Sequence, residues 1–267
     1  MIIYMKNYLF ILFLLISFHL SAQTKGILTY SRILKDSVAN SYTPQGFTGI
    51  WKQYFSGEKS IEIANPLTDA DEKPLKMVGL NTYVQVSVKK SSRPAFILKD
   101  LSKNEIVHSE SSNLAKVLTE DKVTHFNWKL SNDTAQIGDY LCKKATVNFR
   151  GRNYTAWYSE EIPLQNGPWK FHGLPGLIFK VASDDGLIEY ELIHIELAAP
   201  FDLDLIRIPD SYNEFKKIDH PSYIKLWDQK QAEYDKLSRV QKTTTLQNGV
   251  TSSVTSSISL GTRIERY

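Results

Sequence analysis

The stretch that decides the fold of this chain is Gly167-Pro168-Trp169-Lys170-Phe171-His172-Gly173-Leu174-Pro175-Gly176-Leu177-Ile178-Phe179. It gathers glycines, prolines and large aromatic residues, and it runs directly into an apolar strand. Glycine allows positive φ and close backbone approach, whereas proline restricts φ and lacks an N–H donor. The sequence therefore predicts a segment with one tightly specified path, flanked by two β-hairpins.

The first hairpin is predicted just before this stretch. With Gly151-Arg152 as a two-residue type II′ turn, Phe149 lies opposite Tyr154 and Val147 lies opposite Ala156. A slip by one residue would mix the apolar and polar faces, so the alternation favours this register.

The second hairpin begins inside the stretch. With Asp185-Gly186 as a type I′ turn, Val181 lies opposite Tyr190. From Ile193 onwards the apolar residues change to the other face. This change predicts a β-bulge or a strand that is covered on both faces.

The rest of the chain is predicted to be mostly β, with helices near its C-terminal end. Apolar side chains recur at helical spacing from Pro221 to about Ser238, and Ser211–Glu214 has the spelling of a capping box for a short helix. We therefore expect a mostly β fold, an antiparallel sheet of long hairpins with a C-terminal helix that covers part of it. The other predicted strands span residues 27–34, 49–55, 59–64, 83–88, 95–98, 105–108 and 123–130, with a loop at 65–77.

The first residues have the features of a secretory signal peptide. Lys6 precedes the apolar run Leu9–Leu20, and small residues follow at Ser21 and Ala22. The run is shorter than the about 20 apolar residues that span a bilayer, so the chain is expected not to span a membrane after signal cleavage. We expect residues 1–22 to be the signal peptide, 23–240 a single β-rich domain and 241–267 a flexible Ser/Thr-rich tail, in the periplasm or cell envelope.

The net charge argues against a nucleic-acid-binding protein, and the cysteine content excludes a fold held together by intramolecular disulfides. The formal net charge is +3, and removal of Lys6 with the signal peptide leaves 3 − 1 = +2, which is too balanced for a nucleic-acid-binding surface. The single cysteine, Cys142, cannot form an intramolecular disulfide. Because it lies within a predicted strand, a buried structural thiol is favoured over a nucleophile.

Several separated elements lead up to the stretch quoted first, namely Ile137-Gly138-Asp139-Tyr140-Leu141-Cys142-Lys143-Lys144-Ala145, Gly151-Arg152, Ala156-Trp157-Tyr158 and Ile162-Pro163. Together with Gly173, Leu174, Pro175, Gly176, Leu177 and Ile178, they resemble the GLPGLI family of secreted proteins, which is found largely in Bacteroidetes. This chain departs from the family pattern by one inserted residue, Asp139. The resemblance implies a periplasmic or surface protein of unestablished activity, and it supplies no catalytic residue.

Two further resemblances concern architecture and modification. Long antiparallel hairpins packed by a helix resemble the open half-barrel of periplasmic lipoprotein carriers of the LolA type, an analogy of fold alone. Asp36-Ser37-Val38 and Asp133-Thr134-Ala135 resemble O-glycosylation acceptors of exported Bacteroidetes proteins. Ser37 and Thr134 are therefore candidate acceptors, and both fall in predicted loops.

No arrangement of residues with catalytic or metal-binding spacing stands out. The histidines are scattered, no His-Glu-x-x-His or Gly-x-Ser-x-Gly pattern occurs, and Gly173-Leu174-Pro175-Gly176 lacks the lysine that follows a phosphate-binding loop. We therefore expect no catalytic residue, no metal site and no cofactor.

The aromatic residues around the quoted stretch give the leading functional hypothesis. It is that the loop shapes the mouth of an apolar groove that binds an apolar small molecule, a lipid chain or a peptide without catalysis. The expected ligand-binding residues are Trp157, Trp169, Phe171, His172 and Leu174. The alternative for the same residues is that they only form the core.

Two other functional classes stay open at this point. The first is a protein-interaction accessory to an outer-membrane system, which would present the loop or an exposed sheet edge to a partner such as an outer-membrane protein. The second is a hydrolase that uses His172 with a nearby carboxylate, Glu160 or Glu161.

Overall fold

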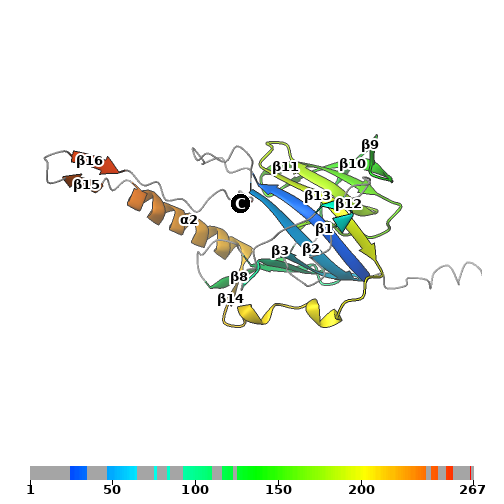
Figure 1. The fold of residues 1–267 in the computed structure, drawn as a ribbon, viewed down its shortest axis with the longest axis horizontal. Coiled ribbons are helices and arrows are strands. Elements are labelled where there is room, and N and C mark those ends of the chain that lie inside the picture. The colour runs from blue at the N-terminus through cyan, green and yellow to red at the C-terminus, as the bar shows by residue number, and fades with distance from the viewer. Residues whose placement is uncertain are drawn as a thin grey trace, which may run out of the picture.

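The computed structural model of this chain describes residues 25–34, 47–64, 75–76, 83–84, 93–109, 116–122, 125–238, 242–245, 251–254 and 265. Twelve strands form one open sheet in the order β14-β8-β7-β6-β3-β2-β1-β13-β12-β11-β10-β9 (Figure 1). Neighbouring strands are antiparallel except β14 and β8, which are parallel. The predicted mostly β fold, with an open sheet of long hairpins and a C-terminal helix, is confirmed.

The elements have the following bounds. The strands of the large sheet are β1 (Lys25–Leu34), β2 (Phe47–Ser56), β3 (Lys59–Ala64), β6 (Phe96–Asp100), β7 (Glu105–Ser109), β8 (Val117–Lys122), β9 (Lys129–Ile137), β10 (Tyr140–Phe149), β11 (Arg152–Ser159), β12 (Leu177–Ser183), β13 (Ile188–Leu197) and β14 (Lys216–Asp219). Two small hairpins pair β4 (Leu75–Lys76) with β5 (Tyr83–Val84) and β15 (Lys242–Thr245) with β16 (Thr251–Val254). The helices are η2 (Leu203–Leu205), η3 (Asp210–Tyr212) and α2 (His220–Ser238).

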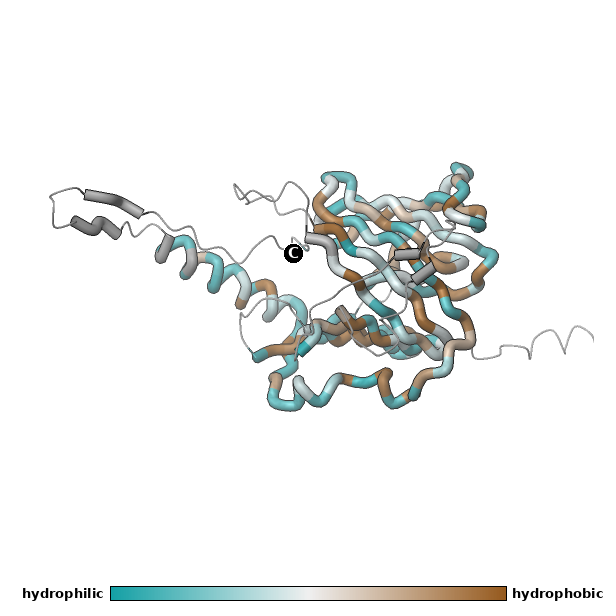
Figure 2. Tube along the Cα trace, viewed as in Figure 1, coloured by the Kyte–Doolittle hydropathy of each residue, from teal (hydrophilic) through white to brown (hydrophobic). Residues whose placement is uncertain are grey.

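Helix α2 lies at the edge of the sheet. It packs against β8 and β14 and then extends away from the sheet (Figure 1). Most of its residues are hydrophilic (Figure 2). The sequence predicts that this helix covers part of the sheet. In the structure it instead contacts the edge of the sheet and is anchored there at its N-terminal end.

The hairpin of β10 and β11 has a different turn from the predicted one. Arg150 (φ 49°) and Gly151 (φ 77°) both have positive φ, as a type I′ turn requires. Phe149 therefore lies opposite Arg152, so the pairing is shifted by two residues from the prediction. A shift of two leaves every side chain on its predicted face, and for this reason the alternation alone could not distinguish the registers.

The hairpin of β12 and β13 has the predicted register. Val181 lies opposite Tyr190 and Lys180 lies opposite Glu191. Of the two expected turn residues only Gly186 (φ 68°) has positive φ, so the connection is not the predicted type I′ turn.

The predicted bulge in β13 is confirmed. Thr29 of β1 lies opposite His194, whereas the next residue, Tyr30, lies opposite Leu192. Ile193 is thus the extra residue of a β-bulge, at the point where the apolar face changes.

The strand predicted at residues 123–130 is wrong over residues 125–128, which are not in a strand. Strand β9 begins only at Lys129. Phe126 and Trp128 are half-buried as their alternation indicated, but their rings pack against Phe171. Packing against Phe171, and not pairing with a neighbouring strand, thus accounts for the partial burial of Phe126 and Trp128.

Other local predictions fare differently. The capping-box helix expected at Ser211–Glu214 is the short 3₁₀ helix η3, whose N-cap is Pro209 and has no side-chain acceptor. Strand β8 was not predicted. The predicted signal peptide and most of the loop and strand predicted at 65–77 and 83–88 lie outside the described residues, and the domain boundaries stay a prediction.

The quoted stretch lies in the loop that joins β11 to β12, residues 160–176, which we call the motif loop. Every residue from Asn166 to His172 is buried. Trp169, Phe171 and Leu174 belong to a core cluster that also contains Tyr154 of β11. The motif loop is therefore an interior element of the protein.

Two glycines of the motif loop are required for different reasons. A Cβ on Gly176 would lie 2.1 Å from the carbonyl oxygen of Ser159, a backbone atom. Gly173 has φ +83°, and a Cβ at this position would have no other atom within 4 Å. Close backbone approach explains Gly176, and positive φ explains Gly173.

We predict that Gly176→Ala lowers the free energy of unfolding by about 3 kcal/mol, because the backbone at Ser159 must move to admit the methyl group. The matched variant Gly173→Ala meets only the φ penalty and should lose about 1–2 kcal/mol. Urea unfolding of the two variants measures both values. Equal losses, or a smaller loss for Gly176→Ala, would contradict the proposed steric origin.

Candidate functional site

The backbone of the motif loop is bound by side chains from distant strands. Gly167 O accepts hydrogen bonds from Gln53 Nε2 at 2.9 Å and Lys99 Nζ at 2.6 Å. Asn166 Nδ2 donates to Ser60 Oγ at 3.1 Å. These partners lie on β2, β6 and β3, whereas the loop joins β11 to β12. The loop therefore links two separate parts of the sheet.

Trp169 is held in an unusual backbone conformation by a buried carboxylate. Its φ is +52°, a region that L-residues seldom occupy, and its N–H donates to Glu62 Oε2 at 2.7 Å. Burial raises the pKa of Glu62 to about 7, although Lys99 and the Trp169 N–H act in the opposite direction. Burial also lowers the pKa of Lys99, and the Glu62 charge limits that shift.

A second group of buried charges lies where the motif loop meets β8. Lys170 Nζ donates to Asp121 Oδ2 at 2.9 Å and to Glu265 Oε1 at 2.7 Å. The Lys170 side chain is fully buried, and the two carboxylates are nearly so. Charge-assisted bonds of this kind are the stronger hydrogen bonds in proteins.

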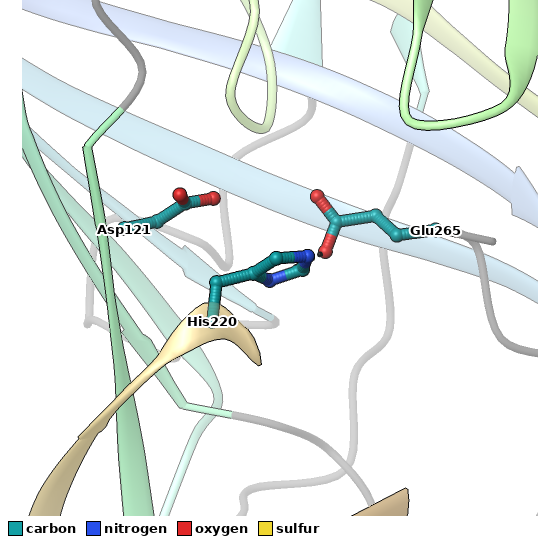
Figure 3. A group of neighbouring side chains, drawn as sticks. All are labelled: Asp121, His220 and Glu265. Carbon is teal, nitrogen blue, oxygen red and sulfur yellow. Dashed lines mark ion pairs between the residues drawn. The ribbon is translucent and has the colours of Figure 1, made fainter. Parts of the chain in front are cut away.

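Two further residues complete this group, which we call the Lys170 cluster: Lys170, Asp121, Glu265, Arg150 and His220. Arg150 Nη2 donates to Asp121 Oδ1 at 2.7 Å, and His220 Nδ1 lies 3.3 Å from Glu265 Oε2. Burial raises the pKa of Asp121, but Lys170 and Arg150 lower it more, so its net shift is downward. The side chains of Asp121, His220 and Glu265 converge from β8, from the start of α2 and from near the end of the chain (Figure 3).

The same group offers ligand atoms to a metal ion. One atom from each of Asp121, His220 and Glu265 lies within 4.8 Å of the others. However, the Lys170 ammonium binds both carboxylates, and Arg150 adds a second positive charge. A divalent cation would add +2 to a buried group that is already charge-balanced, so the arrangement favours the ammonium. The expected absence of a metal site stays a prediction.

The residues expected to bind a ligand are mostly interior. Phe171 and Leu174 are almost completely buried, and Trp169 and His172 retain only 6% and 7% exposure. The sequence predicts these side chains at the mouth of an apolar groove, but in the structure they lie in the interior. Trp157 is half-buried and packs against a different core cluster, so the structure brings four of the five together. Their assignment to ligand binding stays a prediction.

Three half-buried aromatic residues lie beside the motif loop, and we call Phe126, Trp128 and Phe149 the aromatic shelf. Their ring centroids lie 5.5, 5.9 and 6.2 Å from that of Phe171. The guanidinium of Arg150 lies over the Phe149 ring, 5.4 Å from its centroid. The shelf is therefore continuous with the Lys170 cluster.

His172 is fixed by its neighbours. Its Nδ1 lies 2.9 Å from Lys170 O, and since a carbonyl can only accept, Nδ1 carries the proton. Trp128 Nε1 donates to His172 O at 2.9 Å. Burial lowers the pKa of His172 to about 4, against a weaker opposing effect of the Lys170 carbonyl, so the ring is neutral at pH 7.

The carboxylates proposed to act with His172 are engaged elsewhere. Glu160 Oε2 accepts from Lys143 Nζ at 2.8 Å, and Glu161 Oε1 accepts from the Leu141 N–H at 2.9 Å. In the described part of the chain, no hydrogen bond or ion pair joins either of them to His172. The geometry thus gives no support to the hydrolase alternative.

Other residues singled out in the sequence have clear positions. Thr134 is exposed on the edge strand β9, not in a loop, while Ser37 lies outside the described residues.

Cys142 is buried, and burial raises the pKa of its thiol to about 12. The thiol is therefore protonated at neutral pH, as expected for a structural cysteine.

Sequence reasoning missed most of the Lys170 cluster. Asp121, His220 and Glu265 are far apart along the chain, and none belongs to a recognisable spacing. The only local signal was Lys170 itself, a charged residue between Trp169 and Phe171 in an otherwise apolar segment. Such a lysine needs buried partners, but the sequence does not indicate which.

Comparisons with known proteins cover the chain only in part. Residues 150–180 match a family described as "Protein of unknown function (Porph_ging)", a stretch that includes the whole motif loop. Among curated proteins, none matches this chain in sequence. In the described part of the chain, no helix has the length and apolarity that crossing a bilayer requires.

Solved structures that resemble this chain weakly include the following two. A structure of PNGF-II shares 14% identity over 79% of this chain, with a TM-score of 0.45. The structure of the Pseudomonas aeruginosa MucA/MucB complex shares 8% identity over 73% of this chain, with a TM-score of 0.34. This chain spans 34% of the length of PNGF-II and 59% of the matched chain in the MucA/MucB complex. At these values neither likeness assigns a function.

We predict that Lys170→Met lowers the free energy of unfolding by about 3–5 kcal/mol, because it leaves two buried carboxylates without their shared ammonium. The control is Lys143→Met, which removes the exposed ion pair with Glu160 and should cost far less, because solvent screens exposed ion pairs. Urea unfolding measures both. A loss for Lys170→Met no larger than that of the control would show that the cluster contributes nothing to stability.

His172 should make the protein less stable as pH falls. Its folded-state pKa is about 4 against an ordinary value of 6.5, so between these values the unfolded chain binds a proton that the folded chain does not. The stability contribution is therefore lost as pH falls from 6.5 towards 4, by at most about 1.4 kcal/mol per pH unit.

The measurement is the difference in unfolding free energy between the wild type and His172→Asn from pH 4 to 8. Asparagine keeps an N–H donor for the Lys170 carbonyl but does not titrate. The raised pKa of Glu62 acts in the opposite direction, and it cancels in the difference because both proteins contain it. A difference that does not vary with pH would contradict the assignment to His172.

Proposed function

We propose that this chain is a non-catalytic binding protein of the cell envelope that holds a peptide segment at the aromatic shelf and the Lys170 cluster. The observation that carries this proposal is the position of Glu265. This residue, two positions before the end of the sequence, is buried with its carboxylate on Lys170 and His220. The surface beside the motif loop thus already binds a carboxylate from a remote part of a polypeptide.

The chemistry of the surface favours a peptide over a wholly apolar ligand. A lipid chain could pack on Phe126, Trp128 and Phe149, but it offers no anionic group to the cations of the Lys170 cluster. An apolar ligand that displaced Glu265 would leave one positive charge without its carboxylate, and a buried charge without a partner costs several kcal/mol. A peptide with neighbouring apolar and acidic residues offers an apolar side chain for the shelf and a carboxylate for the cluster.

The proposed location is the periplasm or the cell surface. It is supported by the order of Lys6, the apolar run Leu9–Leu20 and the small residues that follow. Membership of the GLPGLI family is part of the same proposal, and it rests on the motif Gly173–Ile178 and the elements before it. The proposed source of the peptide is another protein of the envelope, such as an outer-membrane protein.

The test is equilibrium binding of two probes to the full-length protein: a fluorescent decapeptide with the sequence of residues 258–267, and 1-dodecanol, an apolar chain without a carboxylate. We expect saturable binding of the peptide but not of 1-dodecanol. Phe149→Ala should weaken peptide binding about tenfold, equivalent to about 1.4 kcal/mol. The control Leu197→Ala alters an exposed leucine of β13 and should leave binding unchanged.

Two outcomes would contradict the proposed function. One is an absence of saturable peptide binding up to millimolar concentration both in the wild type and in a Glu265→Gln variant. The other is binding of 1-dodecanol alone, which would identify an apolar ligand in place of a peptide.

A further inference from the structure

We infer that Lys170 and His220 form a carboxylate-binding site that the chain's own Glu265 occupies, so that an acidic peptide binds by displacing it. This inference rests on the proposed function and names the ligand class of the same site. It adds that Glu265 of the same chain competes with the peptide for this site.

Each oxygen of the Glu265 carboxylate lies close to a nitrogen atom of another element. Oε1 accepts from Lys170 Nζ at 2.7 Å, and Oε2 lies 3.3 Å from His220 Nδ1. The side chain is only 6% exposed. A carboxylate with an ammonium on one oxygen and an imidazole nitrogen close to the other suits this site better than a neutral amide or a hydroxyl, because neither of these supplies two charged acceptors.

The charge of the site requires an anion. With Glu265 in place, two carboxylates balance Lys170 and Arg150. Without it, Asp121 alone faces both cations, and one buried positive charge is left over. An uncompensated buried charge is strongly unfavourable, so the site is stable when a carboxylate fills it, whether from the tail or from a ligand.

Glu265 belongs to the part of the sequence that follows helix α2. Helix α2 ends at Ser238, so 265 − 238 − 1 = 26 residues separate the helix from Glu265. A group on the same chain competes as an intramolecular ligand, at an effective concentration set by the connecting segment. A free peptide must compete with Glu265. Its apparent affinity is therefore its intrinsic affinity multiplied by the fraction of protein in which Glu265 has left the site.

The aromatic shelf extends the site beyond the carboxylate. Phe149 lies under Arg150, which binds the same Asp121 as Lys170 does. Phe126 and Trp128 continue the apolar surface towards Phe171. The ligand class that fits is a peptide with a carboxylate next to a large apolar residue, the carboxylate coming from a side chain or from the chain end.

The experiment compares the full-length wild type with Glu265→Gln, which keeps the size of the side chain and removes its charge. Two decapeptides based on residues 258–267 are titrated by fluorescence anisotropy. The first has an amidated end, so its only carboxylate is on the glutamate side chain. The second carries the Glu265→Gln substitution and a free C-terminal carboxylate. An amidated peptide with Glu265→Gln has no carboxylate and is the negative probe.

We expect Glu265→Gln to bind at least one of the two carboxylate peptides tenfold or more tightly than the wild type does. The negative probe should show no such gain. The protein control is Glu233→Gln on α2, which removes an exposed carboxylate paired with Lys230 and should behave as the wild type. Circular dichroism checks that each variant retains its β-rich fold. The peptide that gains affinity identifies the source of the carboxylate.

The outcomes separate this inference from the proposed function. If peptides bind and Phe149→Ala weakens them, but Glu265→Gln changes no affinity, the carboxylate site is wrong and the peptide-binding function stands. Equal gains for the negative probe and the carboxylate peptides would also overturn the inference. If no peptide binds any variant, the proposed function fails and the inference fails with it.

Discussion

The structure depends on the need to satisfy the backbone of a buried loop. Buried N–H and C=O groups must have hydrogen-bond partners, and backbone bonds of the motif loop, such as Gly173 N–H to Gln165 O, supply some of them. Side chains supply others: two donors for the Gly167 carbonyl and one acceptor for the Trp169 N–H. Because these side chains come from β2, β3 and β6, satisfying the loop also ties it to the far part of the sheet.

This constraint explains why charged residues lie inside the protein. Glu62 and Lys99 bind loop backbone, and each partly offsets the cost of burying the other. Lys170 then brings its own charge into the interior and requires Asp121 and Glu265. Buried ion pairs add little net stability compared with apolar packing, but losing one partner is costly. The buried charges therefore serve mainly to fix the motif loop in one position, and they add less to the stability of the fold.

The aromatic residues of the motif have a different role from the one first expected. Trp169 and Phe171 fill the space between loop and sheet, and the partly exposed rings belong to Phe126, Trp128 and Phe149. The conformations of Trp169 and Gly173, both with positive φ, direct the loop so that its aromatic side chains point inward. The surface available to a ligand is consequently formed by residues next to the motif.

The sequence by itself determined the strand faces, the register of the β12–β13 hairpin and the bulge at Ile193, because side-chain alternation with a period of two is a local property. It could not separate registers that differ by two residues, since both put the same side chains inward, and the turn at Arg150 and Gly151 decided between them. It also could not assign Gly176 to close approach or assemble the Lys170 cluster. Those features depend on which backbone and which charges meet across the sheet, and such contacts between distant residues exist only once the chain has folded.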